Sequence, residues 1–107
     1  MLALEIYQET KKFPPEERYD MTDQLRRSSR SVPRNIAEAW RRRRYEKAFI
    51  AKLSDSEAEA AETQVWLDYS LECGYITTDI HEKLFKDYDH IIGKIVNMIT
   101  QPEKWSV

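Results

Sequence analysis

The sequence has few residues that break helices, and it lacks the usual features of membrane and disulfide-bonded proteins. Its 107 residues include two glycines, four prolines and one cysteine. A single cysteine allows neither an internal disulfide nor a thiolate metal cluster, so we expect Cys73 to be a small packed hydrophobe. No apolar run approaches the roughly 18 residues of a membrane span, and the N-terminus has no secretory pattern. We therefore expect a cytoplasmic protein with no membrane partner.

The residues that are present favour one helical domain. Hydrophobic residues make up 41% of the chain and charged residues 34%, which is the balance of a folded domain with a hydrated surface. Glutamate, arginine, alanine and lysine are among the most frequent residues, and all four are good helix formers. A chain of this length is expected to form a single domain, residues 1–107, around one core.

Apolar residues at spacings of three and four divide the chain into four helical segments, at about 2–12, 19–43, 45–73 and 77–101. Phe13-Pro14-Pro15 ends the first segment, Gly74 is a natural cap for the third, and Pro102 follows the fourth. Short connections make successive helices antiparallel neighbours, so we predict an all-α, antiparallel up-down-up-down four-helix bundle. The first segment is short for a helix of such a bundle. A natural chain that begins upstream of Met1 is therefore an open alternative.

Pro33 lies inside the second segment and must remove one backbone hydrogen bond. The helix either kinks there or breaks and restarts at Asn35-Ile36-Ala37-Glu38, which has the form of a capping box. The apolar spacing continues past the proline as far as Trp40, which we expect in the core. We therefore favour a kink near Pro33.

Positive charge is concentrated in the middle of the chain. Between Arg26 and Lys52 there are ten basic residues and two acids, a net charge of +8, which leaves −10 for the rest of a chain whose total is −2. On a continuous helix, most of these arginines fall within one arc of roughly 100°, separate from the apolar arc. Guanidinium groups bind phosphate oxygens through paired donors. The candidate nucleic-acid-binding residues are Arg26, Arg27, Arg30, Arg34, Arg41, Arg42, Arg43, Arg44 and Lys47.

An alternative partner for these arginines is protein carboxylate. Beyond its first turn, the third segment carries the acids Asp55, Glu57, Glu59, Glu62, Asp68 and Glu72. The arginines would then pair with acids within or between subunits, or with an acidic partner protein, and nucleic acid would play no part. Exposed pairs contribute only about 0–1 kcal/mol each. They would therefore determine how the subunits align and add little to stability. A solvated face without a partner is the third alternative.

We find no convincing catalytic or metal site in the sequence. A di-iron bundle needs Glu-x-x-His pairs from two helices. The nearest pattern is Asp87-x-x-His90, and His81 has Thr78 three positions before it, so the second pair is missing. There is no glycine-rich phosphate loop or zinc motif. We therefore predict a non-catalytic protein without cofactor or metal.

Aromatic residues are more numerous than a small bundle core easily holds. The chain has three tryptophans and six tyrosines. Trp66 and Tyr69 lie three positions apart beside the apolar stripe of the third segment, and large aromatic residues concentrate at protein interfaces. We predict that these two anchor an interface between copies of the chain, with a widened internal core as the alternative. Trp105 follows Pro102 and is expected in a tail.

Three stretches also resemble a known family: Thr22–Ser29 leading to Val32–Glu38, then Glu62–Leu67, then Cys73–Ile76. They are similar to the four-helix bundle proteins encoded by intervening sequences inside 23S ribosomal RNA genes, and the match covers nearly the whole chain. This resemblance implies a ring-shaped homo-oligomer, a pentamer, with no established enzymatic activity. Ala39 stands where many members have glycine, which favours a second helix that continues through Trp40.

The same family is similar to the accessory variability protein of diversity-generating retroelements, a basic bundle that partners a reverse transcriptase and nucleic acid. Together with the arginines, this resemblance predicts a non-catalytic homo-oligomer whose basic surface binds RNA or DNA. The alternative is a structural or regulatory homo-oligomer whose basic segment pairs with acidic protein surfaces.

Overall fold

The computed structural model describes residues 1–105, which form four α-helices and two single-turn 3-10 helices. They are α1 (Leu2–Thr10), η1 (Pro15–Glu17), α2 (Met21–Arg41), α3 (Glu46–Glu72), α4 (Thr78–Thr100) and η2 (Pro102–Lys104). The described part of the chain contains no strand. Within it, no helix is both long and apolar enough to cross a membrane. The all-helical fold class is therefore confirmed.

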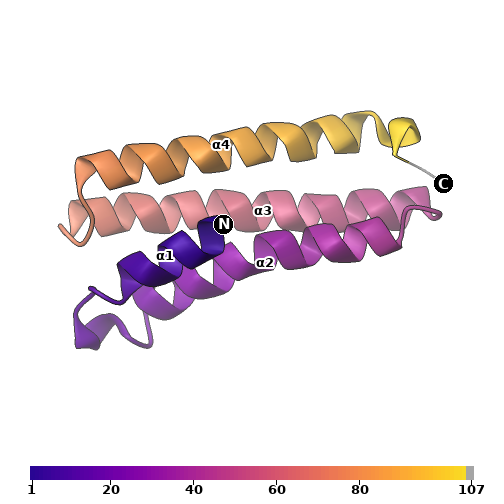
Figure 1. The fold of residues 1–107 in the computed structure, drawn as a ribbon. Coiled ribbons are helices and arrows are strands. Elements are labelled where there is room, and N and C mark those ends of the chain that lie inside the picture. The colour runs from indigo at the N-terminus through magenta and orange to yellow at the C-terminus, as the bar shows by residue number, and fades with distance from the viewer. Residues whose placement is uncertain (106–107) are drawn as a thin grey trace.

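The three long helices lie side by side with α3 in the middle, and the short α1 lies against α2 (Figure 1). Helix α3 packs against α2 on one side and α4 on the other. Each helix in Figure 1 runs opposite to the one before it, and these contacts are consistent with an up-down-up-down arrangement. The turn between α2 and α3 and the C-terminal segment therefore lie at the same end of the molecule.

The helix ends follow local chemistry. Gly74, just after α3, has a φ of +76°, a left-handed conformation that glycine adopts without steric cost. The Gly74 and Tyr75 N–H groups donate to the carbonyls of Leu71 and Ser70 at 3.0 and 2.9 Å, closing the end of α3. At the start of α4, the Thr77 hydroxyl accepts a 3.2 Å hydrogen bond from the Ile80 N–H.

Helix α2 continues through Pro33 without interruption. The alternative in which the helix breaks and restarts at Asn35 is therefore wrong. Asn35 is buried inside the helix, where its side-chain N–H donates to the Ser31 carbonyl at 2.9 Å. Pro33 has no N–H to offer the Ser29 carbonyl one turn earlier, which frees the axis to bend at this point.

Two apolar clusters form the core. The first, toward the end where α1 packs, includes Ile6, Leu25, Leu67 and Tyr88, one from each α-helix. The second, toward the α2–α3 turn, consists of Ala39, Phe49, Leu53 and Ile95 from the three long helices. Removal of these side chains from water is the main force that holds the helices together.

Helix α1 is only nine residues long and covers part of the groove between α2 and α4. Ile6 is fully buried, and on the surface Glu5 pairs with Lys83 of α4 at 3.1 Å. Beyond Leu2, an apolar hollow of about 270 Å³ remains between α2 and α4, bordered by Val32, Ile36, Ile91, Ile95 and Met98 among others.

Candidate nucleic-acid interface

The structure divides the candidate basic residues into two groups. Four of them lie along the first two thirds of α2, between α1 and α3, and we call them the inner arginines: Arg26, Arg27, Arg30 and Arg34. The other five surround the turn between α2 and α3, and we call them the basic tip: Arg41, Arg42, Arg43, Arg44 and Lys47. The division arises because α2 ends at Arg41, so the three arginines that follow lie in the turn.

Two of the inner arginines hold α1 against α2. The Arg26 Nε donates to the Thr10 hydroxyl at 2.7 Å, and its guanidinium lies 4.5 Å from the centroid of the Tyr7 ring. The Arg30 guanidinium lies 5.7 Å from the same ring. A cation over an aromatic face is attracted by the negative π face. Both side chains thus contribute to packing within the chain.

Arg27 is paired with the acids of α3. Its guanidinium contacts Glu62 at 2.8 Å and Glu59 at 3.4 Å. Arg34 donates to the Ser31 hydroxyl at 3.3 Å. For Arg27, therefore, the carboxylate alternative holds, and the pairing is within one chain.

The basic tip is different, because the ion pairs among residues 1–105 include none of its five members. Glu38, the acid of α2 nearest to the turn in sequence, contacts Lys52 at 2.7 Å. That hydrogen bond and the Lys52 charge lower the pKa of Glu38, with Arg34 and Arg42 adding to the effect. Because Glu38 already has a cation as its partner, the guanidinium groups of the tip remain available to other anions.

Aromatic rings lie among these guanidinium groups. The expectation that Trp40 is in the core is wrong: Trp40 is 44% exposed, and its neighbour Ala39 takes the buried position. The Arg43 guanidinium lies 3.7 Å from the Trp40 ring centroid, and the Arg43 Nε donates to the Trp40 carbonyl at 2.9 Å. Tyr45, the residue before α3, is also exposed.

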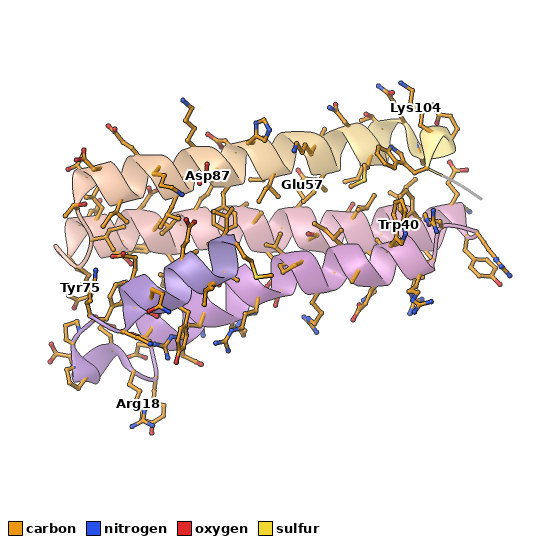
Figure 2. The ribbon with its side chains drawn as sticks, viewed as in Figure 1. Arg18, Trp40, Glu57, Tyr75, Asp87 and Lys104 are labelled. Carbon is orange, nitrogen blue, oxygen red and sulfur yellow. The ribbon has the colours of Figure 1, made fainter. Side chains whose placement is uncertain are left out.

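Trp105 joins the tip from the other end of the chain. It packs edge-on to Trp40, with ring centroids 6.2 Å apart, and is 39% exposed. Buried Pro102 sets the position of the segment that carries it. The expectation that Trp105 lies in a tail is therefore wrong. Figure 2 shows Trp40 and Lys104 at this same end of the bundle.

The predicted interface pair, Trp66 and Tyr69, has a mixed environment. Their rings are 5.8 Å apart. Trp66 is half-buried and packs against the core, whereas Tyr69 is half-exposed and lies one turn from exposed Val65. The Trp66 Nε1 is buried and has no hydrogen-bond partner among the described residues. In this group, Tyr69 and Val65 are therefore the side chains most exposed to another molecule.

Several acids and one histidine of the described chain are engaged in pairs, and nowhere in residues 1–105 do three or more potential ligands gather around a metal-sized site. Asp87 contacts Lys83 at 2.9 Å, and Asp68 contacts the His81 Nε2 at 2.7 Å. Asp87 and His90 line a shallow surface depression together with Lys86 and Asp89.

A family model described as 23S rRNA-intervening sequence protein matches residues 1–97. The chain belongs to this family. The family resemblance of the three sequence stretches is thereby confirmed. Similarity to the accessory variability protein of diversity-generating retroelements stays a prediction.

Among solved structures, this intervening-sequence protein is similar to a protein of unknown function from the S23 ribosomal protein family of Bacteroides thetaiotaomicron. The TM-score is 0.82 and the sequence identity 30%, over 92% of this chain and 91% of that chain. No curated protein sequence matches.

Sequence reasoning about this intervening-sequence protein missed Tyr7 and Thr10 as partners of the inner arginines. The signal for them was weak, because these residues belong to α1 and precede Arg26 by 16 or more positions. It also missed the contact of Trp105 with Trp40 beside the basic tip. The local cue for this contact is Pro102, which is buried.

Proposed function

We propose that this protein is a non-catalytic, homo-oligomeric bundle that binds RNA or DNA through the basic tip. The observation that carries the proposal is the contrast between the two groups of arginines. Each inner arginine has a hydrogen bond, ion pair or ring contact with another side chain. Within residues 1–105, Arg41, Arg42 and Arg44 have no side-chain hydrogen bond or ion pair, and Arg43 contacts Trp40 but no carboxylate. Four adjacent guanidinium groups attract phosphates and displace their counterions.

The proposed site is smaller than the sequence indicated. The nine candidate residues reduce to the five of the basic tip, because the inner arginines already have partners. Arg26 and Arg30 contact α1, and Arg27 pairs with acids of α3. Arg34 donates to Ser31 within α2. Arg27 in particular would have to give up two carboxylates to reach a phosphate. The partner that fits this surface is RNA or DNA in the cytoplasm. The proposed similarity to the retroelement accessory protein also favours a nucleic-acid partner.

Self-association is the second part of the proposal. An up-down-up-down bundle with exposed Val65 and Tyr69 on α3 presents an apolar surface for a second copy. Repetition of one head-to-tail contact closes a ring when the rotation between subunits allows it, and a pentamer is the form we propose. Five copies would bring five basic tips into one assembly, which strengthens binding to a long polyanion.

A salt series on labelled RNA tests the nucleic-acid part. We expect the affinity of the parent protein to fall steeply between about 50 and 200 mM salt, because bound phosphates release counterions. Changing Arg41, Arg42, Arg43 and Arg44 together to Gln is expected to lower the affinity, and to make the salt slope shallower by about one unit for each lost contact.

The matched control removes four charges elsewhere: Lys11→Gln, Lys12→Gln, Arg18→Gln and Lys86→Gln. All four are exposed, and none belongs to the basic tip. This control is expected to keep most of the affinity and the slope of the parent. Equal loss in both variants would mean diffuse attraction to net charge, and no binding by the parent at 50 mM salt would leave the acidic-protein alternative.

A further inference from the structure

We propose that the basic tip takes single-stranded nucleic acid, whose unpaired bases stack on Trp40, Arg43 and Trp105. We call these three residues the stacking cluster. The inference rests on the proposed function and deepens it by naming the class of nucleic acid. It is carried by the placement of exposed rings among guanidinium groups that, within residues 1–105, have no carboxylate partner.

The first observation is that two of the three tryptophans are exposed at one place. Trp40 lies one residue before the end of α2 and Trp105 follows η2, yet their rings meet at 6.2 Å between centroids. They are 44% and 39% exposed. Adjacent exposed indole rings from distant parts of a chain are typical of a binding surface. The third tryptophan, Trp66, packs against the core.

The second observation is that Arg43 is fixed in place beside these rings. Its Nε donates to the Trp40 carbonyl at 2.9 Å, and its guanidinium lies 3.7 Å from the Trp40 ring centroid. Bases stack on guanidinium planes as well as on aromatic rings. Because Arg43 is already held by two contacts, a base that stacks on it orders little additional side chain.

The third observation is the sequence around the turn. Trp40 and Tyr45, both exposed, flank four consecutive arginines. Base-stacking groups and phosphate-binding groups therefore lie together within six residues, as in surfaces that bind single strands without sequence preference. A duplex hides the faces of its bases in its own stack, so it can use only the arginines of this surface. The same tip is thus expected to prefer a single strand.

The experiment compares four labelled probes of equal length with the parent protein: single-stranded RNA, single-stranded DNA, the DNA duplex, and an abasic DNA strand. The abasic strand keeps the phosphates and lacks the bases. We expect the two single strands to bind about 10-fold or more tighter than the duplex and the abasic strand. The ratio of the RNA and DNA affinities shows whether the 2′-hydroxyl contributes.

Trp105→Ala is the main variant, because Trp105 lies outside the four α-helices. Loss of one stacking group is expected to weaken single-strand binding roughly 5- to 100-fold and to leave the salt slope and abasic-strand binding unchanged. Trp40→Leu is the second variant, with circular dichroism and thermal melting to verify its fold. Tyr19→Ala removes a side chain that is 80% exposed and distant in sequence from the tip, and it is expected to change nothing.

Failure of the stacking proposal can be distinguished from failure of the proposed function. If single strand, duplex and abasic strand bind equally well, and Trp105→Ala has no effect while the four Arg→Gln changes still weaken binding, then stacking is overturned and the proposed function stands. If the parent binds none of the probes at 50 mM salt, both are overturned.

Discussion

The Ser56 hydroxyl on α3 donates a 2.8 Å hydrogen bond to the Val32 carbonyl on α2, next to Pro33. Ser56 is fully buried. Seven residues further along α3, the Thr63 hydroxyl forms a 2.9 Å hydrogen bond with the Ser28 hydroxyl. These contacts require small side chains between the helices. They fix α2 against α3, and so they fix the position of the turn that carries the basic tip.

Enlarging residue 56 is expected to force the two helices apart. We expect Ser56→Leu to destabilise the protein by about 1–3 kcal/mol or more, because the buried site has no room for added methylene groups. Ser56→Ala is expected to cost about 0.5–1.5 kcal/mol through loss of the hydrogen bond. Urea unfolding measures both values.

Ser54→Leu is the control, because Ser54 is exposed two residues earlier on the same helix. It is expected to change stability by less than about 0.5 kcal/mol. Equal effects at residues 54 and 56 would contradict close packing of α2 on α3.

The sequence predicted the helices well, because local signals such as Gly74, Thr77 and the apolar spacing decide where they lie. It did not predict that α2 ends at Arg41. The apolar spacing of three and four is equally compatible with Trp40 facing the core, and the packing of Ala39 in a cluster with Phe49 settles which residue is buried.

The candidate site was predicted only in outline. Composition located the basic segment, but it could not separate Arg27, which has carboxylate partners, from Arg43, which lies on a tryptophan ring. That separation depends on tertiary neighbours. Residues such as Glu62 and Trp105 are 35 and 65 positions from their partners Arg27 and Trp40.

Docking of α1 is expected to depend on Ile6. This side chain is fully buried in the first core cluster, so Ile6→Ala should cost about 2–5 kcal/mol if α1 stays docked. If α1 detaches instead, its amides should lose protection in hydrogen exchange while those of α3 keep theirs. Leu4→Ala is the control, because Leu4 is exposed on the same helix. An unchanged exchange pattern and stability in Ile6→Ala would contradict this packing.

The end of the bundle opposite the basic tip is expected to respond to alkaline pH. The Tyr75 hydroxyl donates to the Glu17 carboxylate at 2.8 Å. This hydrogen bond, together with desolvation, raises the pKa of Tyr75 from 10.0 to about 12. Because the folded state favours the protonated phenol, this contribution to stability is complete below pH 10 and is lost as the pH rises through about 12.

Tyr75→Phe tests this linkage. Below pH 10 the variant is expected to be less stable than the parent, and the difference is expected to shrink as the pH rises toward 12. Denaturant unfolding at several pH values between 8 and 12 measures it. Tyr45→Phe, at an exposed tyrosine, serves as the comparison. A stability difference that does not change with pH would show that the hydrogen bond is not linked to Tyr75 ionisation.

Assembly is expected to depend on the exposed surface of α3. We expect the parent to sediment as a closed homo-oligomer of more than two subunits at micromolar concentration. Tyr69→Glu should reduce the sedimentation coefficient toward that of a monomer, because it places a charge in an apolar contact. Tyr19→Glu makes the same change at another exposed tyrosine and should assemble normally. A monomeric parent would contradict the proposal.

Trp66→Phe is expected to separate core packing from assembly. The Trp66 indole N–H is buried without a partner among the described residues, so its removal gives up no hydrogen bond and relieves a desolvation cost. The smaller ring leaves a small void, and the two effects are expected to offset within about 1 kcal/mol. Thermal melting measures the result. A large loss of assembly without loss of stability would place Trp66 itself in the interface.

The contact between Trp40 and Trp105 also determines how the protein should be handled. A tag or fusion partner attached after residue 107 leaves the chain only two residues beyond the stacking cluster. The start of α1 lies about half-way along the bundle, away from the tip (Figure 1). N-terminal tags are therefore suited to binding assays and immobilisation, whereas a bulky C-terminal fusion would mask the stacking cluster.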